Sequence, residues 1–269
     1  MSEALMVRLA CWNVNSITAR LDFTLDFLVT RKPDLVCLQE LKIDDEKFPR
    51  LAFVQAGYTP LTFGQPQYNG VGVLVRKELD PKPELLTTGL AGQEAMGSRL
   101  ITVRAAGLRV TSVYVPNGKT LDHPDYQNKL AFLEDRARFA EREAQTGEPV
   151  VIAGDYNLCP ADLDTWDAAR HAGHIFHTDA ERERFRALLG HGFVDLFRAR
   201  HPDLAAFSWW DYRAGAFHKK QGLRIDLVLG NAPVRERLED AEIDREFRKK
   251  RAGLTASDHA PVIVTLRDA

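Results

Sequence analysis

Carboxylate, amide and imidazole side chains stand where short apolar runs of this sequence end. They come from five places in the chain: Asn13 with Asn15, Glu40, Asp155 with Asn157, Asp226, and Asp258 with His259. Asp226 interrupts an apolar run, where a carboxylate is costly unless it is paired or binds a metal. Together these side chains could hold a cation, a water molecule and a phosphate group.

Each of these residues has a structural explanation when it is taken alone. Asn-x-Asn and Asp-x-Asn spacings also occur in turns, where the side chains bond the local backbone. Glu40 alone is typical of a solvated strand end, and Asp226 could form a buried ion pair with Arg224 or another base. Asp258 and His259 could cap the last strand through hydrogen bonds. The choice between structure and catalysis therefore depends on the whole set.

The whole set favours metal-assisted hydrolysis of a phosphoester. No serine or cysteine nucleophile motif accompanies it, and a phosphodiester needs a positioned water, a cation and neutral donors. Glu40 and the asparagine pair offer hard oxygen ligands, which favour Mg²⁺ or Mn²⁺ over zinc. Asp155 offers a base, and Asn157 offers a donor to a phosphate or a water. A His259 that donates to Asp226 would be held in one tautomer.

Strands and helices must place these side chains, and the apolar pattern predicts where they lie. Runs rich in Val, Ile and Leu predict strands at residues 7–14, 35–39, 71–75, 108–115, 150–153, 225–229 and 262–266. Several runs are continuously apolar, which is typical of strands covered on both faces. Apolar periodicity predicts helices at residues 21–31, 125–145 and 181–189. The pattern indicates a mixed α/β protein.

Composition and charge restrict the class of protein. The chain has 269 residues, of which 45% are hydrophobic and 28% charged. With no internal repeat or linker-like break, one domain over residues 1–269 is expected.

The net charge of −2 provides no global positive field, so any contact with nucleic acid must be local. Cys11, Cys37 and Cys159 form no CxxC pair, which favours a reducing, cytoplasmic location. No apolar run approaches the roughly 18 residues that span a bilayer, so no membrane partner is expected.

Eight segments resemble the signatures of a single enzyme group. They are Trp12-Asn13-Val14-Asn15, Leu38-Gln39-Glu40, Val113-Tyr114-Val115-Pro116-Asn117-Gly118, Gly154-Asp155-Tyr156-Asn157, Gly192-Phe193-Val194-Asp195-Leu196-Phe197-Arg198, Phe207-Ser208-Trp209-Trp210-Asp211-Tyr212-Arg213, Gly222-Leu223-Arg224-Ile225-Asp226-Leu227 and Ser257-Asp258-His259-Ala260-Pro261. In these segments the chain resembles the exonuclease III group of AP endonucleases, within the endonuclease/exonuclease/phosphatase superfamily. The segments follow the order of that group over nearly the whole chain, so the resemblance is highly specific.

The resemblance implies a fold and a set of roles. The implied fold is a four-layered α/β sandwich of two mixed β-sheets flanked by helices, with one site at a single end. Glu40 is implied as the principal metal ligand, with Asn13, Asn15 and Asp258 near the cation. The implied catalytic residues are Asp155 on the attacking water, Asn157 and Tyr114 on the scissile phosphate, and Asp226 with His259 to bind and polarise that phosphate. Whether Asp155 or His259 is the base stays open.

The segment at residues 207–213 separates this group from the wider superfamily. By resemblance, Trp209 packs against an extrahelical abasic sugar, whereas Trp210 is expected to be buried. Basic residues near this segment favour local contact with DNA: Arg213, Lys219, Lys220, Arg224 and the run at residues 248–251.

The turn after the first strand departs from the pattern of the group. The group commonly has glycine where Ser16 stands and arginine where Thr18 stands, so one phosphate contact is missing. Arg20 remains in this turn and is expected to contact DNA.

The residues and the resemblance together predict a Mg²⁺-dependent DNA repair phosphodiesterase, with Mn²⁺ as an alternative ion. It is expected to cut the backbone 5′ to abasic sites, and to have 3′-to-5′ exonuclease and 3′-phosphatase activity. Its expected partner is duplex DNA with abasic sites or 3′-blocked ends, and it is expected to act as a monomer.

Two alternative functions are a superfamily phosphatase for a small phosphoester such as an inositol phosphate, and a DNA-binding module without catalysis. The segment at residues 207–213 and the basic runs count against the phosphatase. The presence of every acid and of His259 counts against the binding module.

Overall fold

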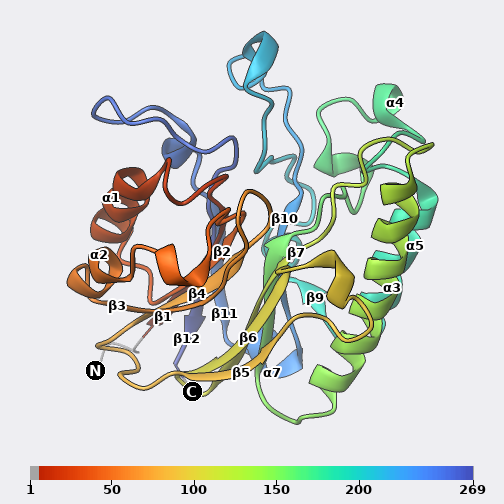
Figure 1. The fold of residues 1–269 in the computed structure, drawn as a ribbon. Coiled ribbons are helices and arrows are strands. Elements are labelled where there is room, and N and C mark those ends of the chain that lie inside the picture. The colour runs from red at the N-terminus through yellow and green to blue at the C-terminus, as the bar shows by residue number, and fades with distance from the viewer. Residues whose placement is uncertain (1–5, 269) are drawn as a thin grey trace.

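In the computed structural model, which describes residues 6–268, two six-stranded β-sheets pack face to face (Figure 1). In order of neighbouring strands, the first sheet contains β11 (Leu238–Ile243), β12 (Val262–Arg267), β1 (Met6–Asn13), β2 (Leu35–Gln39), β4 (Val71–Arg76) and β3 (Tyr58–Phe63). The second contains β5 (Glu84–Thr88), β6 (Leu100–Ala105), β7 (Leu108–Tyr114), β8 (Val150–Asp155), β10 (Asp226–Gly230) and β9 (Val194–Asp195). Both sheets are mixed, because β1 runs parallel to β2 and β7 runs parallel to β8.

Helices cover the outer faces of the sheets and complete four layers. Helices α1 (Leu21–Arg31) and α2 (Arg50–Gln55) lie outside the first sheet, and α3 (Pro124–Ala144) and α5 (Asp179–Leu189) lie outside the second (Figure 1). The shorter helices are α4 (Ala168–His171), α6 (Leu196–Arg200) and α7 (Ala232–Glu236). The expected α/β sandwich is thereby confirmed. None of the helices within residues 6–268 has both the length and the apolar character required to cross a membrane.

Burial of both strand faces explains the continuous apolar runs. In β1, Leu9 and Cys11 face the core between the sheets, where they join Val151 of β8. The next residue, Trp12, points the other way and packs on Phe27 of α1, with ring centroids 5.1 Å apart. A strand between another sheet and a helix layer must be apolar on both faces.

The topology brings the ends of several strands to one edge of the sandwich. Helix α1 connects the parallel strands β1 and β2, and α3 connects β7 and β8, so each pair ends on the same side. Strand β10 runs antiparallel to β8 and begins at that edge, with Asp226 opposite Asp155 in the register. Strand β12 runs antiparallel to β1 and also begins there. The residues at or next to these strand ends are Asn13, Glu40, Tyr114, Asp155, Asp226, Asp258 and His259.

Candidate active site

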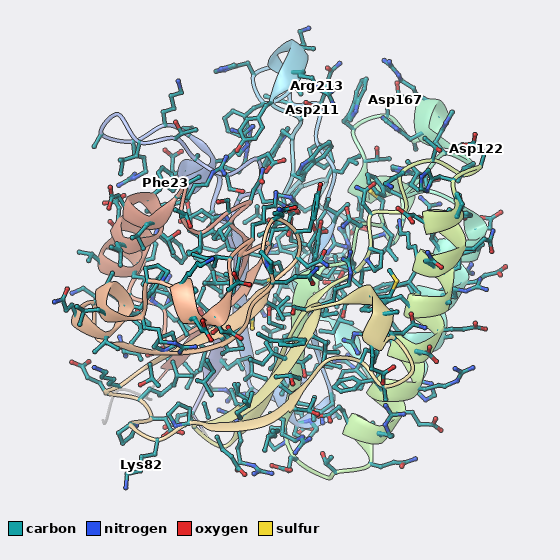
Figure 2. All side chains as sticks on the ribbon, viewed as in Figure 1. Phe23, Lys82, Asp122, Asp167, Asp211 and Arg213 are labelled. Carbon is teal, nitrogen blue, oxygen red and sulfur yellow. The ribbon has the colours of Figure 1, made fainter. Side chains whose placement is uncertain are left out.

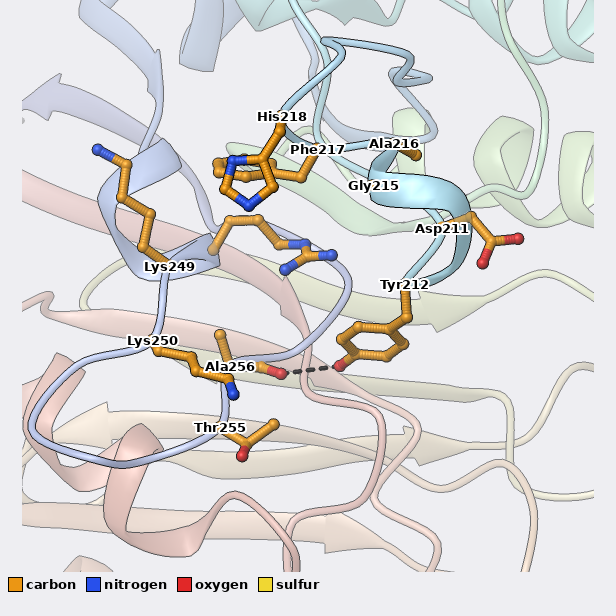
Figure 3. Close-up of a pocket in the computed structure, with 11 residues that line it drawn as sticks. Asp211, Tyr212, Gly215, Ala216, Phe217, His218, Lys249, Lys250, Thr255 and Ala256 are labelled. Carbon is orange, nitrogen blue, oxygen red and sulfur yellow. Dashed lines mark hydrogen bonds between the residues drawn. The ribbon is translucent and has the colours of Figure 1, made fainter.

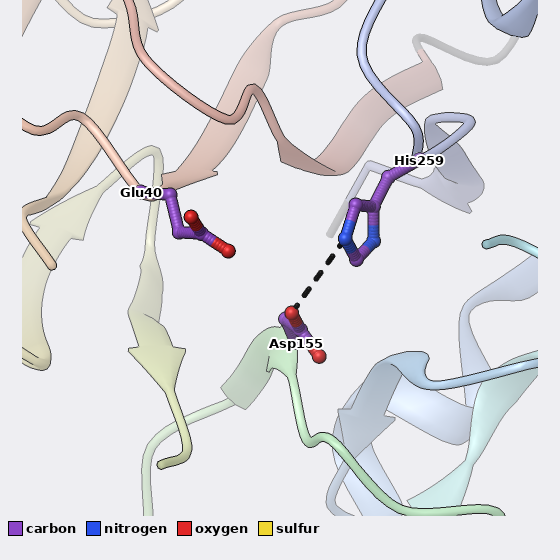
Figure 4. A group of neighbouring side chains, drawn as sticks. All are labelled: Glu40, Asp155 and His259. Atoms are coloured by element: carbon purple, nitrogen blue, oxygen red, sulfur yellow. Dashed lines mark ion pairs between the residues drawn. The ribbon is translucent and has the colours of Figure 1, made fainter. Parts of the chain in front are cut away.

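Three segments far apart in the sequence bring Glu40, Asp155 and His259 together (Figure 4). Glu40 directly follows β2, Asp155 is the last residue of β8, and His259 lies in the loop before β12. One potential ligand atom of each residue lies within 4.8 Å of those of the other two. The site therefore combines two carboxylates with an imidazole at one end of both sheets.

Asn13, at the end of β1, connects the two carboxylates. Its Nδ2 donates to Oε1 of Glu40 at 2.8 Å and to Oδ2 of Asp155 at 2.9 Å. Its Oδ1 accepts the backbone N–H of Asn15 at 3.0 Å. Because Glu40 follows a strand of the first sheet and Asp155 ends a strand of the second, one buried amide joins the two sheets at the site.

Asp226 and His259 form a buried hydrogen-bonded pair. Nδ1 of His259 lies 2.8 Å from Oδ2 of Asp226, so Nδ1 carries the proton and Nε2 faces Oδ2 of Asp155 at 3.8 Å. Burial alone would lower the pKa of His259. Attraction and hydrogen bonding to Asp226, with the charges of Asp258 and Asp155, outweigh burial and raise this pKa well above its ordinary value. These contacts therefore favour the protonated ring.

Asp155 is buried at the centre of the site. Burial raises the pKa of its carboxyl group, and repulsion by Asp226 acts in the same direction, although His259 opposes both. A carboxylate with a raised pKa binds a proton more tightly, which suits a general base. The preceding residue must be glycine, because a Cβ at Gly154 would collide with the carbonyl oxygen of Val113 on β7.

Lys42 is a site residue that the sequence analysis did not identify. Its Nζ lies 2.7 Å from Oε2 of Glu40 and 2.7 Å from Oδ1 of Asn15. Burial alone would raise the pKa of Glu40, but attraction to Lys42 and the hydrogen bond from Asn13 hold this pKa below its usual range. The sequence feature that could have identified Lys42 is its position, two residues after Glu40.

The donor atoms fit a hard divalent cation. The ammonium of Lys42 already lies between oxygens of Glu40 and Asn15, so this pair of oxygens attracts positive charge. Asp258 lies beside them, with Oδ1 accepting from Nδ2 of Asn15 at 3.0 Å. Oδ1 of Asp226 is buried and has no hydrogen-bond partner within residues 6–268. Carboxylate and amide oxygens are the ligands that Mg²⁺ and Mn²⁺ prefer.

The backbone around the site is strained at five residues that are not glycine. Their φ angles are 47° at Asn15, 85° at Ser16, 54° at Glu40, 55° at Lys42 and 47° at Asn157. Left-handed backbone at such residues is uncommon and persists only where the surroundings enforce it. One such restraint is the hydrogen bond from the backbone N–H of Ser16 to the carbonyl of Glu40, at 2.8 Å. The two turns that carry the predicted ligands are therefore fixed against each other.

Tyr114 and Asn157 line the active-site cleft, which Glu40, Asp155 and His259 also line. The hydroxyl of Tyr114 faces Glu40, and burial raises its pKa well above the ordinary value, so the hydroxyl keeps its proton. The amide of Asn157 donates to the carbonyl of Val115 at 2.9 Å and accepts from Nδ2 of Asn117 at 3.3 Å. These bonds fix the amide in place, while its contact with a phosphate remains a prediction.

A buried ion pair behind the cleft supports Asn157. Lys129 of α3 and Glu181 of α5 are both fully buried and bonded to each other. Nζ of Lys129 also donates to the backbone carbonyl of Asn157 at 2.6 Å, and Oε1 of Glu181 accepts the N–H of Phe176 at 3.2 Å. Asn157 and Phe176 both line the cleft, so the ion pair holds two of its lining segments in position.

Replacing Lys129 with methionine is expected to lower the free energy of unfolding by about 3–5 kcal/mol, because Glu181 is left as an unpaired buried charge. The double variant Lys129→Met/Glu181→Leu should regain most of this stability but stay less active than the wild type, because Asn157 and Phe176 lose their support. Urea unfolding and steady-state rates measure the two effects. Lys47→Met, which breaks an exposed pair with Asp44, should change stability by less than about 1 kcal/mol. Equal stability of the wild type and Lys129→Met would contradict the assignment.

The predicted DNA-contacting residues Trp209 and Arg213 lie at the mouth of the cleft, whose volume is about 340 Å³. Nε1 of Trp209 donates to Oδ2 of Asp258 at 3.0 Å, which places the indole against a predicted metal ligand. Figure 2 shows Asp211 and Arg213 on a loop that projects from this end of the molecule, away from Lys82 at the other end. Trp210 is buried, as expected.

Arg20 connects two loops at the site. Its guanidinium donates to the carbonyl of Asn15 and to the hydroxyl of Tyr212, the latter at 3.1 Å. The side chain thereby holds the turn after β1 against the projecting loop. Its contact with DNA remains a prediction.

The prediction that Arg224 contacts DNA is wrong. Its side chain is 1% exposed, and its nitrogens bond Oδ1 of Asp164 at 2.6 Å and Oδ2 of Asp195 at 2.7 Å. A guanidinium enclosed and neutralised by two carboxylates cannot reach a phosphate. Nor does Arg224 pair with Asp226, whose partner is His259.

Comparisons with known proteins agree with the geometry. The family model described as "Endonuclease/Exonuclease/phosphatase family" matches residues 10–259. An exodeoxyribonuclease of Bacillus subtilis is 33% identical, covering 95% of this chain and 98% of the relative. A Neisseria 3′ phosphatase, solved with a product DNA hairpin, is 35% identical with a TM-score of 0.90 over 96% of this chain and 98% of that one. An AP endonuclease of Archaeoglobus fulgidus is 31% identical, with a TM-score of 0.91 over 98% of this chain and 100% of that one.

Proposed function

The chain belongs to the endonuclease/exonuclease/phosphatase family and is a DNA repair nuclease, and we propose that it depends on Mg²⁺ and cuts the backbone 5′ to abasic sites. The observation that carries this proposal is the meeting of Glu40, Asp155 and the Asp226–His259 pair at one cleft. Removal of nucleotides and phosphates from 3′ ends is proposed as the second activity of the same site. The similar proteins named as an exodeoxyribonuclease and a 3′ phosphatase support it.

The proposed substrate is duplex DNA with abasic sites or 3′-blocked ends, and the proposed active form is a monomer. Trp209 lies at the mouth of the cleft, where its ring would pack against the abasic sugar. Turning such a sugar out of the duplex costs little because no base has to be unstacked. Arg213, also at the mouth, has a largely exposed side chain and would contact the backbone nearby.

The residues that would hold the magnesium ion are Glu40, Asn13, Asn15 and Asp258. When bound, the ion supplies charge stabilisation for the phosphate as the reaction proceeds. Lys42 holds the oxygens of Glu40 and Asn15 close together without the ion. The ligands are therefore organised in advance by the protein.

The other side chains perform the hydrolysis. Asp155 accepts a proton from the attacking water, whose oxygen forms a bond to phosphorus as the bond to the 3′ oxygen breaks. The leaving 3′ oxygen takes up a proton from solvent water and becomes a hydroxyl. His259, charged and oriented by Asp226, donates from Nε2 to a non-bridging oxygen, and the donors of Tyr114 and Asn157 contact the same phosphate. The contact with Asp226 raises the pKa of His259 and so favours its protonated ring, which leaves Asp155 as the proposed base.

A duplex with one label and one abasic analogue tests this function. Incubation with Mg²⁺ should give a single product that ends directly 5′ to the analogue, and EDTA should abolish it. Product lengths on a denaturing gel measure the cut. An intact duplex, together with rapid release of phosphate from an inositol phosphate, would instead identify a phosphatase for small substrates. Binding of the duplex without any cleavage would identify a module without catalysis.

A further inference from the structure

A second cavity of about 410 Å³ lies beside the active-site cleft, between residues 211–218 and residues 248–256 (Figure 3). Asp211 borders both hollows, and Ala256 on the cavity wall is two residues from Asp258. The lining of the cavity includes Tyr212, Phe217, His218, Arg248, Lys250 and Thr255. None of the assigned catalytic residues lines this cavity.

Arg248 forms a fixed cationic wall of this cavity. Its guanidinium carbon lies 5.0 Å from the ring centroid of Tyr212 and 5.1 Å from that of Phe217. Nε donates to the carbonyl of Asp258 at 3.0 Å and Nη2 to the carbonyl of Trp210 at 3.2 Å. The residue is 9% exposed, yet no carboxylate within residues 6–268 forms an ion pair with it. A buried arginine held by rings and carbonyls keeps its charge available to an anion.

The rim of the cavity adds further positive charge. Lys250 is exposed there, and no ion pair within residues 6–268 neutralises its charge. The one acid on the lining, Asp211, is already bonded to Arg213 at 2.7 Å. Flat aromatic and guanidinium faces bind nucleobases by stacking, and cations at a rim attract phosphates. The cavity therefore matches a planar base that carries a phosphate.

We propose that this cavity binds an unpaired nucleobase and its adjoining phosphate, from DNA whose damaged strand occupies the catalytic cleft. This inference rests on the proposed DNA nuclease function. The base would enter the cavity beside Tyr212 and Arg248, while Lys250 contacts the phosphate. The enzyme would then favour abasic sites and 3′ ends that have an unpaired base nearby. A free nucleotide has the same chemistry, so the experiment must separate the two sources.

The test compares two duplexes of the same length and charge, each with one abasic site for the catalytic cleft. Near that site, a 2-aminopurine nucleotide is unpaired in the first duplex and paired with thymine in the second. The measurements are made in EDTA, which prevents cleavage. The wild type should bind the first duplex about tenfold more tightly than the second, as base stacking allows, and should quench the 2-aminopurine fluorescence of the first duplex. Thr255→Trp, which fills the cavity from an exposed residue, and Lys250→Glu should both reduce the ratio of affinities to about one. Lys220→Glu makes the same charge change outside the cavity, so both affinities should fall together and the ratio should persist.

The outcomes separate this proposal from the proposed function. Equal affinities in the wild type, or an unchanged ratio in both Thr255→Trp and Lys250→Glu, would overturn the cavity proposal even if incision at abasic sites is normal. A preserved ratio without incision would overturn the function alone. Binding of dAMP, measured by calorimetry, in the absence of any preference for the unpaired base would also overturn the proposal, with free nucleotide as the ligand. Lys250 is exposed, so that variant remains informative even if Thr255→Trp unfolds.

Discussion

Replacing Asp155 with asparagine is expected to reduce the rate of phosphodiester cleavage about 10²- to 10⁴-fold, the range associated with loss of a general base. The amide keeps the shape of the side chain and can still lie beside Asn13, but it cannot accept a proton from water. In the wild type, the rate should rise with pH through the raised pKa of Asp155, because the base must be deprotonated. A pH–rate profile of both proteins measures the effect, and this rising limb should be absent from the variant.

The same measurement on His259→Asn distinguishes the two candidates for the base. If Asp155 is the base, this variant will be slow but will keep the rising limb. Asp122→Asn removes an exposed carboxylate outside the cleft and should stay within about twofold of the wild-type rate. Wild-type activity in Asp155→Asn, or loss of the limb in His259→Asn alone, would reject Asp155 as the base.

The second large effect is expected when His259 itself is replaced. In His259→Asn the rate should fall about 10²- to 10³-fold, as when one oxyanion donor is removed. The free energy of unfolding should also fall by about 3–5 kcal/mol, because Asp226 remains as a buried charge without its partner. Chemical denaturation in EDTA, alongside single-turnover rates, measures both quantities.

A double variant separates stability from catalysis at this pair. His259→Asn/Asp226→Asn removes both charges and should recover most of the stability, while its rate stays low. The pKa of His259 is raised on folding, so its contribution to stability is full below the unfolded value and is lost as the pH rises through the folded value. The single variant should lack this loss at alkaline pH. A double variant as unstable as the single one would show that the ion pair is not the cause.

Sequence patterns predicted the interior strands better than the edges. Seven predicted strands and all three predicted helices are present in the structure. The four strands at the sheet edges, β11, β3, β5 and β9, were missed. Edge strands are partly exposed, and β5 is exposed at four of its five residues, so they lack the apolar signal of a buried strand. Strand β6 was also missed, although Leu100, Ile101 and Val103 carry that signal.

The sequence predicted the position of a site residue correctly where that residue lies at the end of a strand. Asn13, Asp155 and Asp226 belong to this class, because strand direction alone fixes which edge they occupy. Arg224 does not belong to it. Its acidic partners stand 60 and 29 residues away in the sequence, and only the tertiary fold shows that they enclose it.

Asn13 uses both hydrogens of its amide, one for a carboxylate on each sheet. A sideways slip of one sheet by about 1 Å would stretch one of these bonds beyond its useful length. The geometry of the active site therefore depends on how the two sheets are aligned. Loss of bulk among the side chains between the sheets could therefore slow the chemistry from a distance, without altering any group that meets the substrate.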